Sequence, residues 1–158
     1  MVDRRFPGLV RIFHTADWHL GKQLHGVSLH EEQAQVLGQI CHIAERERPD
    51  VIVIAGDVYD RAVPPASSVR LFSETIERMR GTGVPILIIA GNHDSGDRLE
   101  CHASLLAGAG VHIVGSFVAG RDPVVIEDVH GPVAFHLLPY LHPAEVRIAL
   151  DAPELLSL

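Results

Sequence analysis

Four short apolar runs, each separated from the next by a segment with helical periodicity, constrain this chain's fold more than any other feature. The runs cover residues 10–14, 51–55, 85–90 and 111–114 and are rich in Val and Ile. Runs this apolar are typical of strands that are buried on both faces of a sheet. Strands that alternate with helices predict βαβ units and a parallel sheet. We therefore expect an α/β fold.

The segments between the runs show apolar residues at helical spacing. The helix expected over residues 29–48 begins with Ser28 and Glu31 in a capping-box pattern and ends before Pro49. A second helix places Val69, Phe72, Ile76 and Met79 on one face. A third is expected to begin near residue 95 or 97 and to reach residue 107. Beyond residue 115 we expect a hairpin, from strands at 124–127 and 133–138, and a short helix after residue 143.

Length and composition fit one globular domain, which we take as residues 1–158. The chain has 158 residues, of which 47% are hydrophobic and 21% charged. Its longest apolar stretch, residues 84–90, is far shorter than the roughly 20 residues of a membrane-spanning helix. Cys41 and Cys101 form no Cys-x-x-Cys pair, and we interpret both as buried reduced thiols. We therefore expect a soluble cytoplasmic protein with no membrane partner.

Side chains able to bind metal follow each of the first three predicted strands. Asp17 and His19 follow the first, Asp57 the second, and Asn92 and His93 the third. Functional groups in open α/β sheets collect at the carboxyl ends of the strands, so these side chains should meet. Carboxylate and imidazole ligands without thiolates suit Mn²⁺, Fe, Zn²⁺ or Mg²⁺. The pattern predicts a two-metal site for displacement at phosphorus.

The roles expected at this site follow from the position of each loop. Asp57 lies on the central loop and is expected to bridge two ions, with Asp17 and His19 on one ion and the Asn92 carbonyl oxygen on the other. His93 is expected to donate a proton to the leaving oxygen or to hold a phosphoryl oxygen. Each motif alone has a plainer interpretation as a turn or a helix cap, but three such loops at one sheet edge favour a site.

Other features have structural interpretations. We expect packing or surface roles for four further histidines, which are His14, His42, His112 and His136. Trp18 is more typical of a packing residue than of a platform for base stacking. The net charge of −7 argues mildly against nucleic acid as a partner, although bound divalent cations would invert the sign of an acidic site.

The motifs resemble those of the calcineurin-like metallophosphoesterase superfamily, namely Asp-x-His, Gly-Asp and Gly-Asn-His-Asp. Within it, three stretches resemble the SbcD-type nuclease subunits: His-Thr-Ala-Asp-Trp-His-Leu-Gly-Lys at 14–22, Ala-Gly-Asp-Val-Tyr-Asp at 55–60, and Ala-Gly-Asn-His-Asp-Ser at 90–95. Leu-Pro-Tyr-Leu at 138–141 agrees as well.

The resemblance implies a four-layer αββα sandwich and Mn²⁺-dependent exonuclease and endonuclease activity on double-strand ends and hairpins of DNA. It also implies an SbcC-like, SMC-type ATPase partner and a second copy of the chain as a candidate partner. It makes Asp17, His19, Asp57 and Asn92 metal ligands of two ions, with Mn²⁺ favoured, and His93 the catalytic histidine. Asp60 is expected to orient His93.

One departure from the family pattern bears on activity. The family completes its metal site with later histidines, in a Gly-His pair and a Gly-His-x-His motif, and neither occurs in this sequence. We infer that the chain is the N-terminal portion of the sandwich, incomplete at its C-terminal side, from a longer nuclease or a short paralogue. Weak metal binding and little activity are expected. The alternatives are another calcineurin-like phosphoesterase and a non-catalytic fragment that docks on an ATPase.

Overall fold

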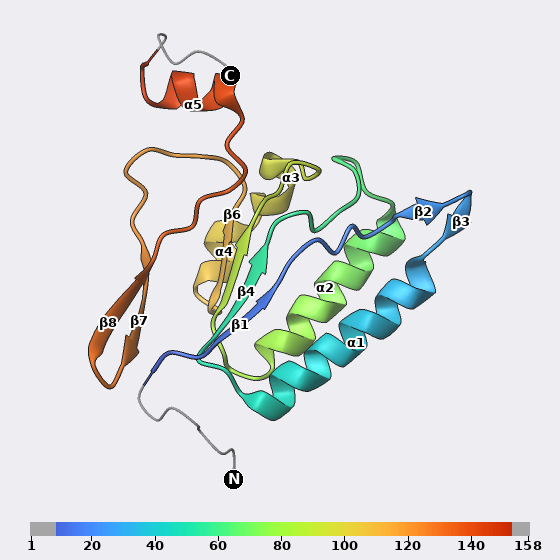
Figure 1. Cartoon of the computed structure of the whole chain (residues 1–158), viewed down its shortest axis with the longest axis horizontal. Coiled ribbons are helices and arrows are strands. Elements are labelled where there is room, and N and C mark those ends of the chain that lie inside the picture. Colours follow the sequence, from blue (N-terminus) through green and yellow to red (C-terminus); the bar gives the residue numbers. More distant parts are fainter. Residues whose placement is uncertain (1–8, 153–158) are drawn as a thin grey trace.

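The computed structural model describes residues 9–152 of the chain, so both ends of the expected 1–158 domain lie outside the described residues. At its centre is a four-stranded sheet with the order β1-β4-β5-β6 and parallel pairing throughout (Figure 1). Its strands are β1 (Ile12–Thr15), β4 (Val51–Ala55), β5 (Ile86–Ile89) and β6 (Val111–Val114). The parallel sheet expected from the four apolar runs is confirmed, with strand bounds that differ by no more than two residues.

Two long helices cover one face of the sheet. They are α1 (His30–Glu47) and α2 (Ala66–Arg80), and they run side by side in Figure 1. Their inward residues Leu37, Cys41, Ile76 and Met79 are buried with the side chains of β4, β5 and β6 in one hydrophobic cluster. This burial removes from water the apolar surface between the sheet and the two helices. It is the main source of the domain's stability.

The third expected helix is two short helices. These are α3 (Gly96–Glu100) and α4 (Ala103–Ala107), which pack beside β6. Leu99 of α3 and Leu106 of α4 both join the core cluster. The break between the two helices lets both leucines reach the core cluster. The prediction of one continuous helix was therefore wrong, because helical spacing alone cannot show such a break.

The expected capping box of α1 was also wrong. Leu29 occupies the N-cap position without a side-chain cap, and Ser28 Oγ accepts a 3.3 Å hydrogen bond from the backbone N–H of His30. Ser28 belongs instead to a small hairpin that was not expected, formed by β2 (Gln23–Leu24) and β3 (Val27–Ser28). His25 and Gly26 at its turn have φ of 51° and 81°. A two-residue turn with both residues left-handed matches the twist of the hairpin strands.

The expected hairpin is confirmed as β7 (Val124–Asp128) and β8 (Gly131–Phe135), although β8 ends before residues 136–138, and the last helix is confirmed as α5 (Pro143–Ala149). This hairpin lies on the other side of the sheet from α1 and α2 (Figure 1). The chain after β8 returns to the sheet, where the Tyr140 N–H donates a 2.8 Å hydrogen bond to the Ala90 carbonyl oxygen. The described residues thus supply one helical layer, the parallel sheet and two antiparallel strands of the expected αββα sandwich.

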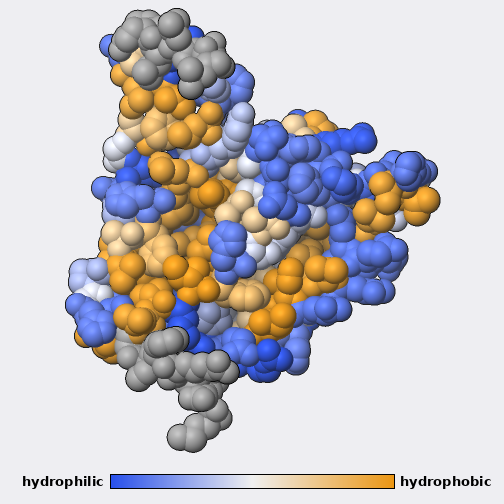
Figure 2. Space-filling view, in the orientation of Figure 1, coloured by the Kyte–Doolittle hydropathy of each residue, from blue (hydrophilic) through white to orange (hydrophobic). Residues whose placement is uncertain are grey.

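The sheet face that turns away from α1 and α2 remains partly open. Figure 2 shows apolar surface gathered over the hairpin and the chain beside it. Ile12, Val125 and Leu138 are each more than half exposed there. A surface of this kind is typical of a face that a further layer covers.

Two further expectations concern the cysteines and membranes. Cys41 is buried in the core as expected, but Cys101 is exposed because it lies in the break between α3 and α4. None of the helices formed by residues 9–152 combines the length and apolar character that crossing a bilayer requires.

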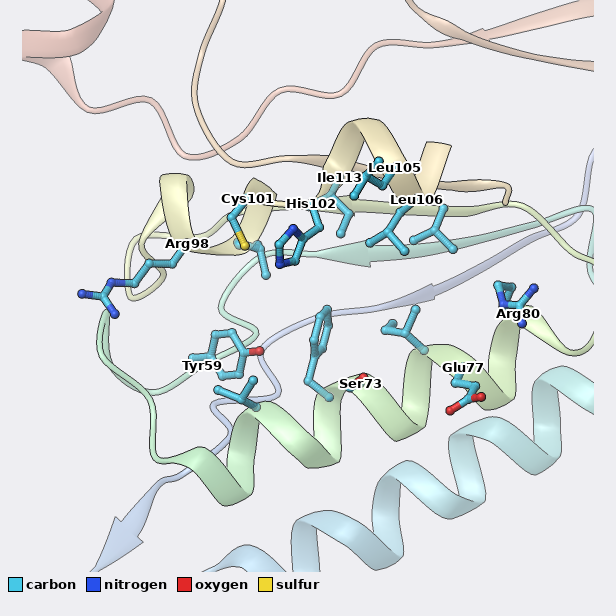
Figure 3. Close-up of a pocket in the computed structure, with 15 residues that line it drawn as sticks. Tyr59, Ser73, Glu77, Arg80, Arg98, Cys101, His102, Leu105, Leu106 and Ile113 are labelled. Atoms are coloured by element: carbon cyan, nitrogen blue, oxygen red, sulfur yellow. The ribbon is translucent and has the colours of Figure 1, made fainter. Parts of the chain in front are cut away.

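A cavity of about 640 Å³ lies between α2 and the α3–α4 pair (Figure 3). Its walls are mainly apolar, and none of the six predicted site residues lines it. Tyr59 is one of its lining residues, and burial raises the pKa of that phenol to about 12, so its hydroxyl stays protonated at neutral pH.

Candidate metal centre

The three loops expected to meet at the carboxyl edge of the sheet are joined by hydrogen bonds. The Asp17 N–H donates to the Gly56 carbonyl oxygen at 3.1 Å, and the His19 N–H to that of Asp57 at 2.9 Å. The third loop joins through the His93 N–H, which donates to Oδ1 of Asp57 at 2.9 Å. Asp57 therefore contacts both neighbouring loops, the first through its main chain and the third through its carboxylate.

Three of the predicted ligands have left-handed backbone conformations. The φ angles are 55° for Asp17, 45° for His19 and 48° for Asp57. A residue with a Cβ atom is strained in this region, at a cost of order 1–3 kcal/mol each, and persists there only when surrounding contacts hold it. The hydrogen bonds between the loops supply such contacts. Strain at three ligand positions is the pattern expected where the backbone is bent to aim side chains at one point.

One group of ligand atoms joins all three loops. Nitrogen atoms of His19 and His93 and a carboxylate oxygen of Asp57 lie within 4.8 Å of one another. Nε2 of His19 is 3.7 Å from Oδ2 of Asp57, and the two imidazole rings meet edge to face with centroids 4.8 Å apart. Asp57 is 8% exposed, whereas His93 is exposed at the mouth of the site.

Asp17 and Asn92 lie beside a small cavity that Asp57 also lines. The cavity has a volume of about 290 Å³, and Leu138 and Tyr140 from the chain after β8 form another part of its wall. Asp17 does not join the group formed by His19, Asp57 and His93. Asp57 thus groups with His19 and His93 and also lines the cavity that has Asp17 and Asn92 in its wall.

The donors fit divalent cations. They are carboxylate, amide oxygen and imidazole nitrogen, the set preferred by Mn²⁺ and similar ions. Among the described residues, the buried Asp57 carboxylate pairs with His19, a group that is charged only when protonated. Nδ1 of His19 is itself buried without a hydrogen-bond partner. A nearly buried carboxylate is stabilised by a bound cation.

Asp60 contacts both histidines, through different atoms. Its main-chain carbonyl oxygen lies 3.0 Å from Nδ1 of His93. Its carboxylate points elsewhere, with Oδ1 3.5 Å from Nδ1 of His19 and 3.6 Å from Nζ of Lys22. The contact between Asp60 and His93 therefore runs through the backbone, and the carboxylate faces the other histidine.

Two residues at the site had no role assigned from the sequence. The Asp94 carboxylate accepts backbone N–H bonds from Val58 at 3.1 Å, Tyr59 at 2.8 Å and Gly91 at 2.9 Å, and so ties the second loop to the third. The other residue, Gln33 of α1, contacts the first loop. A signal for Gln33 exists in the sequence, because it is a polar residue at helical spacing between Leu29 and Leu37 on the apolar face.

Residues expected to have structural roles lie outside the ligand group. Trp18 is buried, its ring meets that of Phe72 edge to face, and its Nε1 donates to Thr15 Oγ1 at 2.9 Å, so the packing role is confirmed. The four histidines expected outside the site do not join its ligand group in the described part of the chain, and these are His14, His42, His112 and His136.

The sequence matches known proteins over most of its length. Residues 10–142 match the family model described as calcineurin-like phosphoesterase. The chain is also 40% identical over 140 residues to the SbcD subunit of the nuclease SbcCD from Bacillus subtilis (strain 168). That alignment covers 88% of this chain but 35% of the relative, so the chain spans about a third of the length of the curated protein it matches.

Proposed function

The chain belongs to the calcineurin-like phosphoesterase family, and from this premise we propose that it is a metal-dependent DNA nuclease that hydrolyses phosphodiester bonds by a two-metal mechanism. One observation carries the proposal: the side chains of three separate loops meet around the nearly buried Asp57 carboxylate, within 4.8 Å for His19, Asp57 and His93. The sequence similarity to a nuclease subunit favours DNA as the substrate class.

In this proposal Asp17, His19, Asp57 and Asn92 hold two divalent ions, with Mn²⁺ as the favoured ion. Asp57 is the proposed shared ligand because it groups with His19 and also lines the same small cavity as Asn92, which supports a bridging role. When bound, such ions lower the pKa of water and neutralise the negative charge that develops on the phosphoryl group. The left-handed backbone at Asp17, His19 and Asp57 is held by hydrogen bonds between the loops, and a backbone fixed in this way lowers the cost of ordering the ligands.

His93 is the proposed catalytic residue. A carbonyl oxygen can only accept a hydrogen bond, so the 3.0 Å contact with Asp60 requires a proton on Nδ1 of His93. Nε2 is then the nitrogen that can donate a proton to the leaving oxygen or hold a phosphoryl oxygen. Asp60 positions this ring through its carbonyl oxygen and the His19 ring through its carboxylate.

The partners expected from the resemblance remain proposals. They are double-strand ends and hairpins of DNA, an SbcC-like SMC-type ATPase, and a second copy of the chain. The relative's name places it in a complex called SbcCD, which supports the ATPase proposal. A cytoplasmic location likewise remains a prediction.

The test compares substrates and metal on the whole chain. Linear duplex DNA, a DNA hairpin and a small aryl phosphate are each incubated with the protein in Mn²⁺ and, separately, in EDTA. Uptake of Mn²⁺ is measured by titration calorimetry. Mn²⁺-dependent cleavage of either DNA, abolished in Asp57→Ala, would support the proposal. Hydrolysis of the aryl phosphate alone would indicate another kind of phosphoesterase. Absence of both cleavage and Asp57-dependent Mn²⁺ uptake would favour the non-catalytic docking fragment.

A further inference from the structure

Gln33 lies in the first third of α1, outside every motif of the site, and its side chain is directed at the first loop. The residue is half-buried, between the apolar positions of the helix that face the core. Its neighbours Gln35 and Gln39 on the same helix are exposed. Its position therefore distinguishes it from the other glutamines of α1.

The amide of Gln33 makes three hydrogen bonds to the backbone of one loop. Nε2 donates to the carbonyl oxygen of Trp18 at 3.1 Å and to that of His19 at 2.7 Å. Oε1 accepts the N–H of Gly21 at 3.2 Å. This orientation of the amide is the one that satisfies the contacts, because a flipped amide would place Oε1 against two carbonyl oxygens.

The conformation of the loop interrupts regular pairing before the isolated parallel bridge between Leu20 and Tyr59. Asp17, His19 and Gly21 all have positive φ, so alternate residues are left-handed. One side of the loop is bonded to residues 56–58 through the N–H groups of Asp17, His19 and Leu20. Gln33 bonds the carbonyl oxygens of Trp18 and His19, and the second of these also accepts the Lys22 N–H at 3.1 Å. An unpaired carbonyl there would carry the cost of a lost hydrogen bond.

We propose that Gln33 is a positioning residue of the metal centre, which holds the strained loop so that His19 faces Asp57. The proposal rests on the proposed function, since it assumes that His19 is a metal ligand. Residues that orient metal ligands typically change metal affinity by roughly 10–100-fold when they are replaced. The effect expected for Gln33 is therefore on metal affinity, with the fold retained.

Gln33→Glu tests the proposal because the added charge and the lost hydrogen bonds predict opposite changes in Mn²⁺ affinity. Glutamate keeps the shape and can still accept the Gly21 N–H, but it cannot donate to the two carbonyl oxygens. A negative charge added near a cation site should strengthen Mn²⁺ binding if charge alone matters. We expect instead that the Mn²⁺ dissociation constant rises about 10-fold. Gln35→Glu adds the same charge to the exposed side of α1 and should change the Mn²⁺ dissociation constant less than about 2-fold.

Gln33→Met is the neutral companion variant, and amide hydrogen exchange of the metal-free protein is the second measurement. Met has a volume similar to that of Gln and removes all three hydrogen bonds, so hydrogen exchange of the Gly21 amide should become about 10-fold faster. The control variant Gln35→Glu should show no change in this exchange. Thermal melting confirms that each variant is folded.

The two proposals fail in different ways. If the unmodified chain binds no Mn²⁺, the proposed function fails, and the exchange measurement still decides the role of Gln33. Unchanged exchange at Gly21 in Gln33→Met, or Mn²⁺ affinity in Gln33→Glu equal to or greater than that of the unmodified chain, would overturn the role of Gln33 alone.

Discussion

Gly91 lies directly against the carboxylate of Asp57, so that a Cβ atom at position 91 would be 2.7 Å from the Asp57 carboxyl carbon and closer still to Oδ1. The Asp57 carboxylate on the second loop therefore requires a glycine at position 91, where the third loop begins. Gly56 shows the same crowding from the other side, because its Cβ would lie 3.1 Å from the Cα of Gly91. The two loops approach as closely as backbones can, which brings Asn92 and His93 to Asp57.

Replacing Gly91 by alanine should disturb the site because the methyl group has no room beside Asp57. We expect Gly91→Ala to lower the free energy of unfolding by about 1–3 kcal/mol and to weaken Mn²⁺ binding at least about 10-fold. Urea unfolding and titration calorimetry measure the two effects. Gly38→Ala is the control, since a Cβ at that helical position meets nothing within 4 Å and should stabilise α1 by about 0.5–1 kcal/mol. Equal behaviour of the two variants would contradict the packing described for Gly91.

Asp94→Asn should destabilise the protein although it barely changes the shape of the side chain. The carboxylate accepts three backbone N–H groups on two oxygens, and an amide has one oxygen. At least one N–H then faces another donor, which costs about 1–3 kcal/mol in the free energy of unfolding. Asp122→Asn on the exposed surface is the control and should be near neutral. A destabilisation no larger than that of the control would show that Asp94 does not hold the loops together.

Asp57→Ala should remove metal binding more completely than Asn92→Ala. Asp57 groups with His19 and also lines the cavity beside Asn92, so it is proposed to bridge both ions, whereas Asn92 is proposed to serve one ion. We expect calorimetry to show no Mn²⁺ uptake in Asp57→Ala and the loss of one ion in Asn92→Ala. Retention of the same number of ions in the two variants would rule out a bridging role for Asp57.

His93→Ala should leave Mn²⁺ bound while DNA hydrolysis falls by roughly 10²–10⁴-fold, because the role proposed for His93 is proton transfer and the proposed ligands of the ions are other residues. Loss of Mn²⁺ in this variant would instead make His93 a ligand, as its place beside His19 and Asp57 allows. Asp60→Asn is the companion variant. It keeps the main-chain carbonyl oxygen that contacts His93, so turnover should fall far less. Rates with duplex DNA under saturating Mn²⁺ measure both. Undiminished hydrolysis by His93→Ala would remove this residue from the mechanism.

The two cysteines should differ in reactivity. Cys41 is 2% exposed, and burial raises the pKa of its thiol above the ordinary value of 9.0, whereas Cys101 is exposed. An aromatic disulfide reagent at pH 8 should therefore modify one thiol in the folded protein and two in urea. Because the folded pKa is raised, the stability due to Cys41 is present below pH 9 and decreases as the pH rises above it. Rapid modification of both thiols without denaturant would contradict this burial.

Much of the architecture could be read from residue patterns. Each of the four parallel strands follows from a β-branched apolar run, and α1 and α2 follow from helical spacing, because these elements bury the faces that their patterns mark. The meeting of the three loops also follows, since parallel strands present their carboxyl ends at the same edge. Patterns failed where the outcome depends on packing between distant segments, as in the break between α3 and α4 and the exposure of Cys101.

Amino-acid types and their order along the chain were therefore enough to identify which side chains collect at the sheet edge and the chemistry that their donors suit. The three-dimensional arrangement decided which atoms contact one another. Asp60 contacts His93 through its carbonyl oxygen and His19 through its carboxylate, and Gln33 and Asp94 hold loops that they do not belong to. These relationships depend on left-handed backbone angles and on side chains that contact other elements. Helical spacing can mark Gln33 as a polar residue on an apolar face, but the order of residues does not show which loop it contacts.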